Sequence, residues 1–218
     1  MDKAIIISGG VAEDEVVRSV LRRLASDDTM VICADAGLNV CDRVGVIPDI
    51  ILGDFDSVDS EVLDKYRLYA KTQFYNYPAK KDFTDTELAC DVAINEGAKQ
   101  IVLLGATGRR MDHTLGVIYL LEQLENKGVT AYIVDQNNVI RCLLPDRYDL
   151  HEFEYGKYVS FIPLSDAVEG INIKGVAYEV ENARFLRTTT LGISNEITEE
   201  EAFIDFKSGT LLMIKSQD

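Results

Sequence analysis

The feature that most constrains the fold is a pattern that repeats through the first 144 residues. Short apolar runs end in Gly or Asp, and each run is followed by a stretch with the periodicity of an amphipathic helix. This alternation is typical of successive βα units, whose parallel strands form one sheet covered by helices. The sequence therefore predicts an α/β domain over residues 1–144, with a doubly wound, mostly parallel sheet.

Individual elements follow from the same pattern. Helix signals include acidic residues at 13–15 before the apolar stripe of Val16, Val20 and Leu24. Thr84 and Glu87 have the spacing of a capping box, so we expect a helix from there to about Gly97. Another helix is expected around residues 117–124, closed by Gly128. The expected strands lie at residues 4–7, 30–34, 50–52, around 74–75, and at 101–104.

The pattern changes at about residue 145. Short alternating segments with turn signals follow, at residues 158–163, 168–173, 176–180, 202–206 and 211–214. Ala202, Ile204 and Phe206 share one face at period two, and Ser208 with Gly209 fits a two-residue hairpin turn. Residues 145–218 are therefore predicted to form an antiparallel β domain.

Charge and composition exclude several partners and sites. The 22 basic and 37 acidic side chains give a net charge of -15, which repels nucleic acid and anionic membranes. The chain contains no apolar run of about 18 residues and no signal-peptide core near Met1, so we expect a cytoplasmic protein. The cysteines lack metal-site spacing and are expected to be buried apolar residues: Cys33, Cys41, Cys90 and Cys142.

The most informative residues are aspartates that follow expected strands or begin expected helices. The carboxyl ends of parallel strands meet along one edge of a sheet, where such folds bind ligands, so we expect these aspartates to converge. Continued strand geometry would point Asp54 and Asp56 the same way, about 7 Å apart. Two carboxylates about 4 Å apart repel by about 4 kcal/mol near a protein surface, so the cluster requires a counter-charge. The set is Asp35, Asp54, Asp56, Asp82, Asp85 and Asp112.

Carboxylates without His or Cys companions are the oxygen ligands that Mg²⁺ prefers, and Mg²⁺ held in this way usually carries substrate phosphates. The aspartates therefore indicate Mg²⁺ together with a nucleoside triphosphate. Glycines in the same loops would let the backbone approach phosphate closely: Gly9, Gly10, Gly105 and Gly108. Positive charge comes from Lys80, Lys81, Arg109 and Arg110.

Four short motifs follow one another along the chain. Residues 53–57 read G-D-F-D-S, and residues 81–85 read K-D-F-T-D. Gly108 and Arg109 are followed by Asp112 and His113, and residues 192–196 read G-I-S-N-E. In these motifs and in their order, the chain resembles the thiamin pyrophosphokinase family over nearly its full length.

This resemblance implies a nucleotide-binding α/β domain, a C-terminal β-sandwich over residues 145–218, and a homodimer with thiamin near the subunit contact. It implies a transferase that converts ATP and thiamin into AMP and thiamin diphosphate. The Mg²⁺ and pyrophosphate centre would comprise Asp54, Asp56, Asp82, Asp85 and Asp112, with Arg109 as a further catalytic group. Ser194 and Asn195 would face thiamin. The implied nucleotide contacts are Gly9, Gly10, Asp35, Gly37, Ser57, Lys81, Thr84, Gly108, Arg109 and His113.

Two other functions fit the same residues. Asp54 and Asp56 after a strand would also suit a phosphatase in which one carboxylate forms an aspartyl-phosphate and the other acts as the acid. A non-catalytic sensor of nucleotide or vitamin would bind without turnover. A phosphoenzyme on Asp54 with no AMP would indicate the phosphatase, and tight binding without turnover would indicate the sensor.

Overall fold

The computed structural model describes residues 1–218 except 79–81, 109 and 153–154. The chain forms two compact units, Met1–Gln136 and Asn137–Asp218. This boundary comes earlier in the chain than the one expected after residue 144. The reason is that β7 (Asn138–Leu143) pairs with β14 (Leu211–Ser216) and so belongs to the second unit. Among the described residues, no helix is both long and apolar enough for a membrane crossing.

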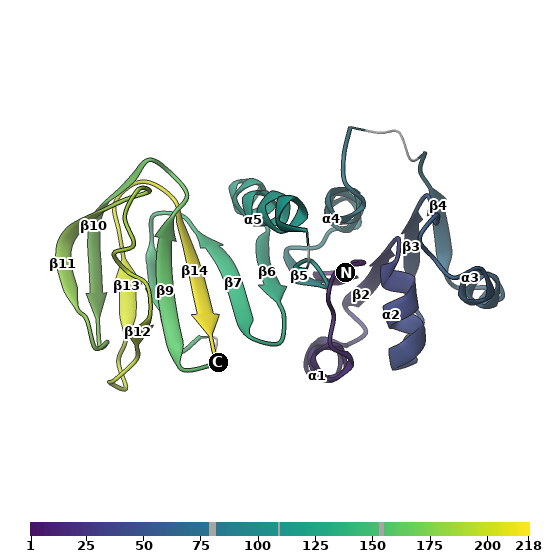
Figure 1. The fold of residues 1–218 in the computed structure, drawn as a ribbon, viewed down its shortest axis with the longest axis horizontal. Helices are drawn as coiled ribbons and strands as arrows, with labels where there is room; N and C mark the ends of the chain where they lie inside the picture. Colours follow the sequence, from purple (N-terminus) through teal and green to yellow (C-terminus); the bar gives the residue numbers. More distant parts are fainter. Residues whose placement is uncertain (79–81, 109, 153–154) are drawn as a thin grey trace. The chain divides into compact units, whose positions relative to one another are not determined.

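The first unit is built on a parallel sheet with the strand order β6-β5-β1-β2-β3-β4 (Figure 1). Helices α4 and α5 lie on one face of this sheet, and α1 and α2 lie on the other, which confirms the predicted doubly wound α/β fold. The strands are β1 (Lys3–Ile7), β2 (Thr29–Ala34), β3 (Ile50–Gly53), β4 (Gln73–Asn76), β5 (Gln100–Leu104) and β6 (Thr130–Val134). The helices are α1 (Asp14–Leu24), α2 (Gly37–Val44), α3 (Ser60–Tyr66), α4 (Asp85–Asn95) and α5 (Met111–Asn126).

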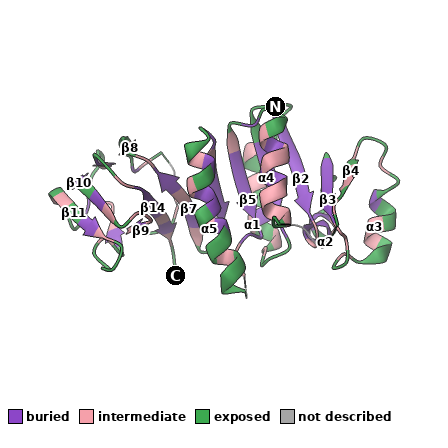
Figure 2. Ribbon diagram, turned by 90° about the horizontal axis from the view of Figure 1, so that it is seen from above, coloured by how far each residue is buried: buried purple, intermediate pink, exposed green. Residues whose placement is uncertain are grey.

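The direction of the strand order reverses between β1 and β5. From β1 the chain adds β2, β3 and β4 toward one side, and it then returns to place β5 and β6 on the other. Strands β1, β2 and β5 are buried along nearly their whole length (Figure 2), which is why they read as continuous apolar runs. In open parallel sheets, ligands bind outside the carboxyl ends of the strands at such a reversal. The topology therefore directs attention to the loops after β1 and β5.

The helix boundaries follow the expected local signals. The hydroxyl of Thr84 accepts a hydrogen bond from the Glu87 N–H at 3.2 Å and so caps α4, as its capping-box spacing predicted. Helix α5 buries the predicted stripe of Val117, Leu121 and Leu124. The short helices α2 and α3, of eight and seven residues, were not expected individually.

The second unit contains two antiparallel sheets, with orders β12-β9-β14-β7 and β11-β10-β13-β8. Side chains from both sheets form one core, among them Phe161, Phe185, Ile204 and Leu211, so the unit is a β-sandwich. The remaining strands are β8 (Arg147–Asp149), β9 (Tyr158–Pro163), β10 (Ala167–Lys174), β11 (Val180–Leu186), β12 (Asn195–Glu196) and β13 (Phe203–Asp205).

Two local predictions in this unit are wrong. Residues 176–180 do not form a strand: Val176 makes an isolated bridge to Ile197, and the strand begins at Val180. Ser208 and Gly209 do not form a hairpin turn, because β13 pairs with β10 and β8, whereas β14 pairs with β7 and β9. The chain crosses there from one sheet to the other.

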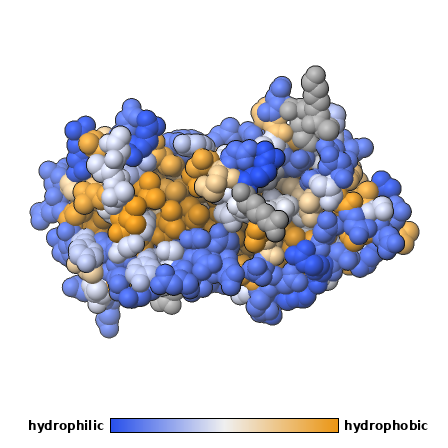
Figure 3. All heavy atoms as spheres, viewed as in Figure 1, coloured by the Kyte–Doolittle hydropathy of each residue, from blue (hydrophilic) through white to orange (hydrophobic). Residues whose placement is uncertain are grey.

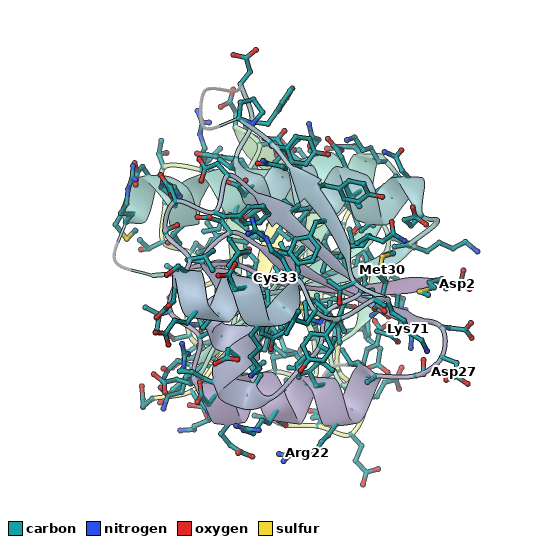
Figure 4. All side chains as sticks on the ribbon, turned by 90° about the vertical axis from the view of Figure 1, so that its right-hand side faces the viewer. Asp2, Arg22, Asp27, Met30, Cys33 and Lys71 are labelled. Carbon is teal, nitrogen blue, oxygen red and sulfur yellow. The ribbon has the colours of Figure 1, made fainter. Side chains whose placement is uncertain are left out.

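The cysteine interpretation is confirmed. All four cysteines lie in the described part of the chain and are buried free thiols. Cys33, at the end of β2, lies inside the first unit, whereas charged side chains such as Arg22 and Asp27 lie at its periphery (Figure 4).

Candidate active site

A cleft of about 650 Å³ opens at the reversal point of the first unit. Residues 8–11 after β1 and residues 105–108 after β5 form one wall. Asp35 and Ala36 after β2, residues 84–86 at the start of α4, and the first turns of α5 complete the lining. The predicted meeting of strand-end loops at one edge is therefore present, and it encloses a space large enough for a small-molecule ligand.

Glycine is required where the loops after β1 and β5 join. The Gly10 N–H donates to the Gly105 carbonyl at 2.7 Å, and the Val11 N–H donates to the Thr107 carbonyl at 2.8 Å. A Cβ on Gly10 would lie 2.3 Å from the Thr107 oxygen, so a larger residue would separate the two loops. Gly9, Gly10 and Gly108, for which we predicted nucleotide contacts, line the cleft.

Gly37 has a different position from the one that we expected for a nucleotide contact. It begins α2, and a Cβ there would lie 2.1 Å from the Ile7 carbonyl oxygen at the end of β1. The described lining of the cleft includes Ala36 but not Gly37. Gly37 therefore allows α2 to pack closely against β1.

Three carboxylates meet beside the cleft. Asp35, Asp54 and Asp56 each offer an oxygen, and these oxygens lie within 4.8 Å of one another. The extended geometry predicted between Asp54 and Asp56 is wrong, because β3 ends at Gly53 and Phe55 has a φ of +63°. The resulting turn is closed by the Asp56 N–H, which donates to Asp54 Oδ1 at 3.1 Å, and it brings the two side chains together.

Asp35 is the half-buried member of this group and also has a left-handed backbone, with φ +47°. Ser57 Oγ donates to its Oδ2 at 2.5 Å, while Oδ1 is buried without a hydrogen-bond partner among the described residues. Burial raises the pKa of Asp35 most. Hydrogen bonds from Ser57 and the Ala36 N–H lower this pKa, and the charges of Asp85 and Asp54 raise it further. Asp35, expected among the nucleotide contacts, thus belongs to the group that could hold a metal.

The other predicted metal ligands are not part of this group, and Asp85 is the one that lines the cleft. Asp85 is the first residue of α4 and lines the cleft close enough for its charge to act on Asp35. Asp112 is exposed and accepts two hydrogen bonds from Arg110, at 2.7 and 3.2 Å, which lower the pKa of its carboxyl. Asp82 is exposed. Among the described residues, the close carboxylate group includes none of these three.

Polar and cationic residues complete the lining. Arg110 and His113 line the cleft at the start of α5, and Ser57 and Thr84 line it from the loops after β3 and before α4. Lys80, Lys81 and Arg109, which we expected to supply positive charge, lie outside the described residues. In the part of the chain that the structure describes, Arg110 supplies positive charge at the cleft.

The predicted thiamin residues lie in the second unit. Ser194 is exposed with φ +58°, and its N–H donates to Ser160 Oγ at 2.9 Å. Asn195 is only 3% exposed: its Oδ1 accepts from the Tyr178 N–H and its Nδ2 donates to the Tyr178 carbonyl, both at 2.9 Å. Tyr178 is 73% exposed. This arrangement was not predicted, because the alternating pattern at residues 176–180 indicated a strand that includes Tyr178.

Comparisons with known proteins agree with both units. The profile of the thiamin pyrophosphokinase catalytic domain matches residues 21–133, and that of the family's vitamin B1 binding domain matches residues 147–211. The thiamine pyrophosphokinase of Bacillus subtilis (strain 168) is 34% identical over 193 residues, which cover 88% of this chain and 89% of that protein.

Solved structures give the same result. A crystal structure of thiamine pyrophosphokinase from Bacillus subtilis matches with a TM-score of 0.89 at 31% identity, over 100% of both chains. That of the Geobacillus thermodenitrificans enzyme matches with a TM-score of 0.84 at 33% identity, over 100% of this chain and 98% of the other. In sequence, in fold and in the order of its two domains, the chain belongs to the thiamin pyrophosphokinase family.

Proposed function

We propose that this enzyme binds Mg²⁺ and ATP at the cleft of its first unit and transfers the pyrophosphoryl group to the hydroxyl of thiamin, giving AMP and thiamin diphosphate. The observation that carries this proposal is the buried Oδ1 of Asp35, which has no hydrogen-bond partner in the part of the chain that the structure describes. It lies beside two further carboxylates, at the edge of a cleft with a glycine-rich wall. A buried carboxylate oxygen without a hydrogen bond is costly, and a cation would satisfy it.

The donor set fits Mg²⁺. Asp35, Asp54 and Asp56 offer oxygen ligands alone, which suits a hard divalent cation better than zinc or copper. Three further aspartates are proposed to complete the acidic centre: Asp82 before α4, Asp85 at the start of α4, and Asp112. When bound there, Mg²⁺ supplies positive charge to the phosphate oxygens.

The chain's own residues then position the reacting groups. The loops around Gly10 and Gly108 bring backbone close to the phosphates, and Arg110 offsets negative charge that develops during transfer. Lys81 and Arg109 are proposed to share this role. A carboxylate of the cleft accepts the proton of the thiamin hydroxyl as it attacks the β-phosphorus of ATP, and AMP leaves.

The second unit is proposed to bind thiamin through Ser194 and the exposed ring of Tyr178. The chain contains no Trp, so an aromatic partner for the thiamin rings must be Tyr or Phe. Asn195 supports this role indirectly, because its two hydrogen bonds fix the backbone of Tyr178.

A homodimer in the cytoplasm is also proposed. On the face seen in Figure 3, hydrophobic residues gather over the second unit. Independently of that view, Leu191 and Ile193 of this unit are 55% and 49% exposed. Light scattering should give twice the mass of one chain, and a monomer mass at micromolar concentration would contradict the dimer. Buried free thiols are typical of reducing compartments, which supports the cytoplasmic location.

Chromatographic detection of AMP after mixing the protein with ATP, Mg²⁺ and thiamin tests the proposed reaction. Asp56→Asn removes one ligand charge without changing core volume, and we expect it to lower turnover at least about 100-fold while the circular dichroism spectrum stays unchanged. Asp64→Asn, an exposed aspartate of α3 paired with Arg67, is the matched control and should be fully active. A phosphoenzyme trapped on Asp54 without AMP would support the phosphatase instead.

A further inference from the structure

We infer that Asp135, a residue that the proposed chemistry does not use, is a positioning residue for nucleotide binding and acts through Thr107. This inference rests on the proposed nucleotide site. Asp135 directly follows β6, so it stands at the same carboxyl edge of the sheet as the loops of the cleft. Thr107 lines the cleft, and its Oγ1 donates to Asp135 Oδ2 at 3.0 Å in a partly buried position.

The loop of residues 105–108 is held from two sides. On one side the loop after β1 donates two backbone hydrogen bonds, from Gly10 to Gly105 at 2.7 Å and from Val11 to Thr107 at 2.8 Å. On the other side Asp135 accepts the Thr107 hydroxyl. The loop thus spans β1, β5 and β6, and Asp135 provides a side-chain attachment to the outermost of these strands.

The hydrogen bond also sets what the loop presents to a ligand. With its hydroxyl donated to Asp135, Thr107 leaves the backbone of residues 105–108 as the polar surface beside the phosphates. Hydrogen bonds to a charged acceptor are stronger than neutral ones, so this bond restricts the loop. A loop fixed before the ligand arrives loses less freedom on binding, which raises affinity.

Asp135 is separate from the acidic centre. Among the described residues, the close carboxylate group comprises Asp35, Asp54 and Asp56 and does not include Asp135. Its removal should therefore weaken nucleotide binding while the metal group stays intact. Thiamin affinity should not change, because the residues proposed to face thiamin lie in the other unit.

The test measures the Kd of a non-hydrolysable ATP analogue with Mg²⁺ by calorimetry. We expect Asp135→Ala and Thr107→Val each to raise this Kd about tenfold, and the double variant to raise it no further than either single change, since both remove the same bond. Asp135→Asn keeps an acceptor and should recover most of the affinity. Thr107→Val preserves side-chain shape and serves if Asp135→Ala fails to fold. Asp64→Ala is the matched control.

A merely structural role would lower stability without this pattern. Unchanged nucleotide Kd in folded variants, additive effects in the double variant, or an equal rise in the KM for thiamin would each overturn the inference. AMP formation by the wild-type protein is measured alongside. Its absence would refute the proposed function itself, whereas normal wild-type turnover with unaltered nucleotide binding in the variants would refute only the role of Asp135.

Discussion

At the scale of single residues, Asp35 combines several features that lower stability in the protein without ligand. Asp35 has a left-handed backbone, a buried oxygen without a hydrogen-bond partner among the described residues, and negative charges nearby. Each of these features is unfavourable in a protein without ligand. A cation bound at this position, as proposed, would compensate them.

The raised pKa of Asp35 gives a prediction with a definite sign. In the folded protein its carboxyl holds a proton at pH values where the unfolded chain, with a pKa near 3.8, has released it. The resulting contribution to stability is present below the unfolded pKa and is lost as the pH rises through the folded pKa. Without Mg²⁺, Asp35→Asn should therefore gain stability relative to the wild type as the pH rises from about 4 to about 7. Urea unfolding in the presence of a chelator measures this difference, and parallel stability curves would contradict it.

Substitutions at Asn195 and Ser194 should differ in their effects on stability and on thiamin binding. Asn195→Ala leaves the backbone groups of Tyr178 without their partners, so we expect a loss of about 1–3 kcal/mol in the free energy of unfolding. Thiamin affinity should fall with it, because the Tyr178 backbone is released. Ser194→Ala should weaken thiamin binding and leave the urea midpoint nearly unchanged. Equal effects of Asn195→Ala on ATP and thiamin binding would argue against these roles.

At the scale of elements, local patterns predicted what depends on local physics. The buried strands read as apolar runs, and Thr84 capped α4 as its spacing indicated. The strand predicted at residues 176–180 failed because a distant side chain, that of Asn195, takes the backbone groups of Tyr178. The sequence of a segment does not report such a partner.

The same distinction applies to the candidate site. Strand direction predicted that aspartates after successive strands would meet at one edge, and the structure brings several of them together there. Which three lie closest depends on the left-handed turns at Asp35 and Phe55, and alternation would have placed Asp54 and Asp56 differently. The ion pair between Arg110 and Asp112 likewise depends on side-chain geometry at the start of α5.

Packing of α2 on β1 gives a prediction at this scale. Gly37→Ala would place a Cβ 2.1 Å from the Ile7 oxygen, so α2 must shift, and we expect a loss of about 1–3 kcal/mol in the free energy of unfolding. Gly116 is the control: it lies within α5, and a Cβ there meets no described atom within 4 Å apart from its chain neighbours and the backbone of its own helix. Gly116→Ala should stabilise the protein by about 0.5–1 kcal/mol, because alanine favours the helix. Thermal unfolding compares the two variants. Equal stability would exclude close packing at Gly37.

At the scale of the whole molecule, the net charge is -15, and three of the acidic side chains meet beside the cleft. Self-repulsion of this size destabilises a compact state and weakens as salt screens it. The polyanionic substrate proposed for the cleft would enter against the overall field, so the proposal requires local cations there. General screening and specific cation binding are two distinct effects on stability, and they can be measured separately.

Sodium chloride should raise the Tm of the protein without nucleotide, through screening alone. Mg²⁺ at equal ionic strength should raise the Tm further. A cation that binds only the folded state adds about 2.7 kcal/mol to the free energy of unfolding when its concentration is 100 times its Kd. Asp56→Asn should keep the response to sodium chloride and lose most of the additional effect of Mg²⁺, since it removes one ligand of the acidic centre. The control Asp64→Asn should keep both responses. An equal Mg²⁺ shift in the wild type and Asp56→Asn would mean that the cation acts on the general surface charge and not at the three carboxylates.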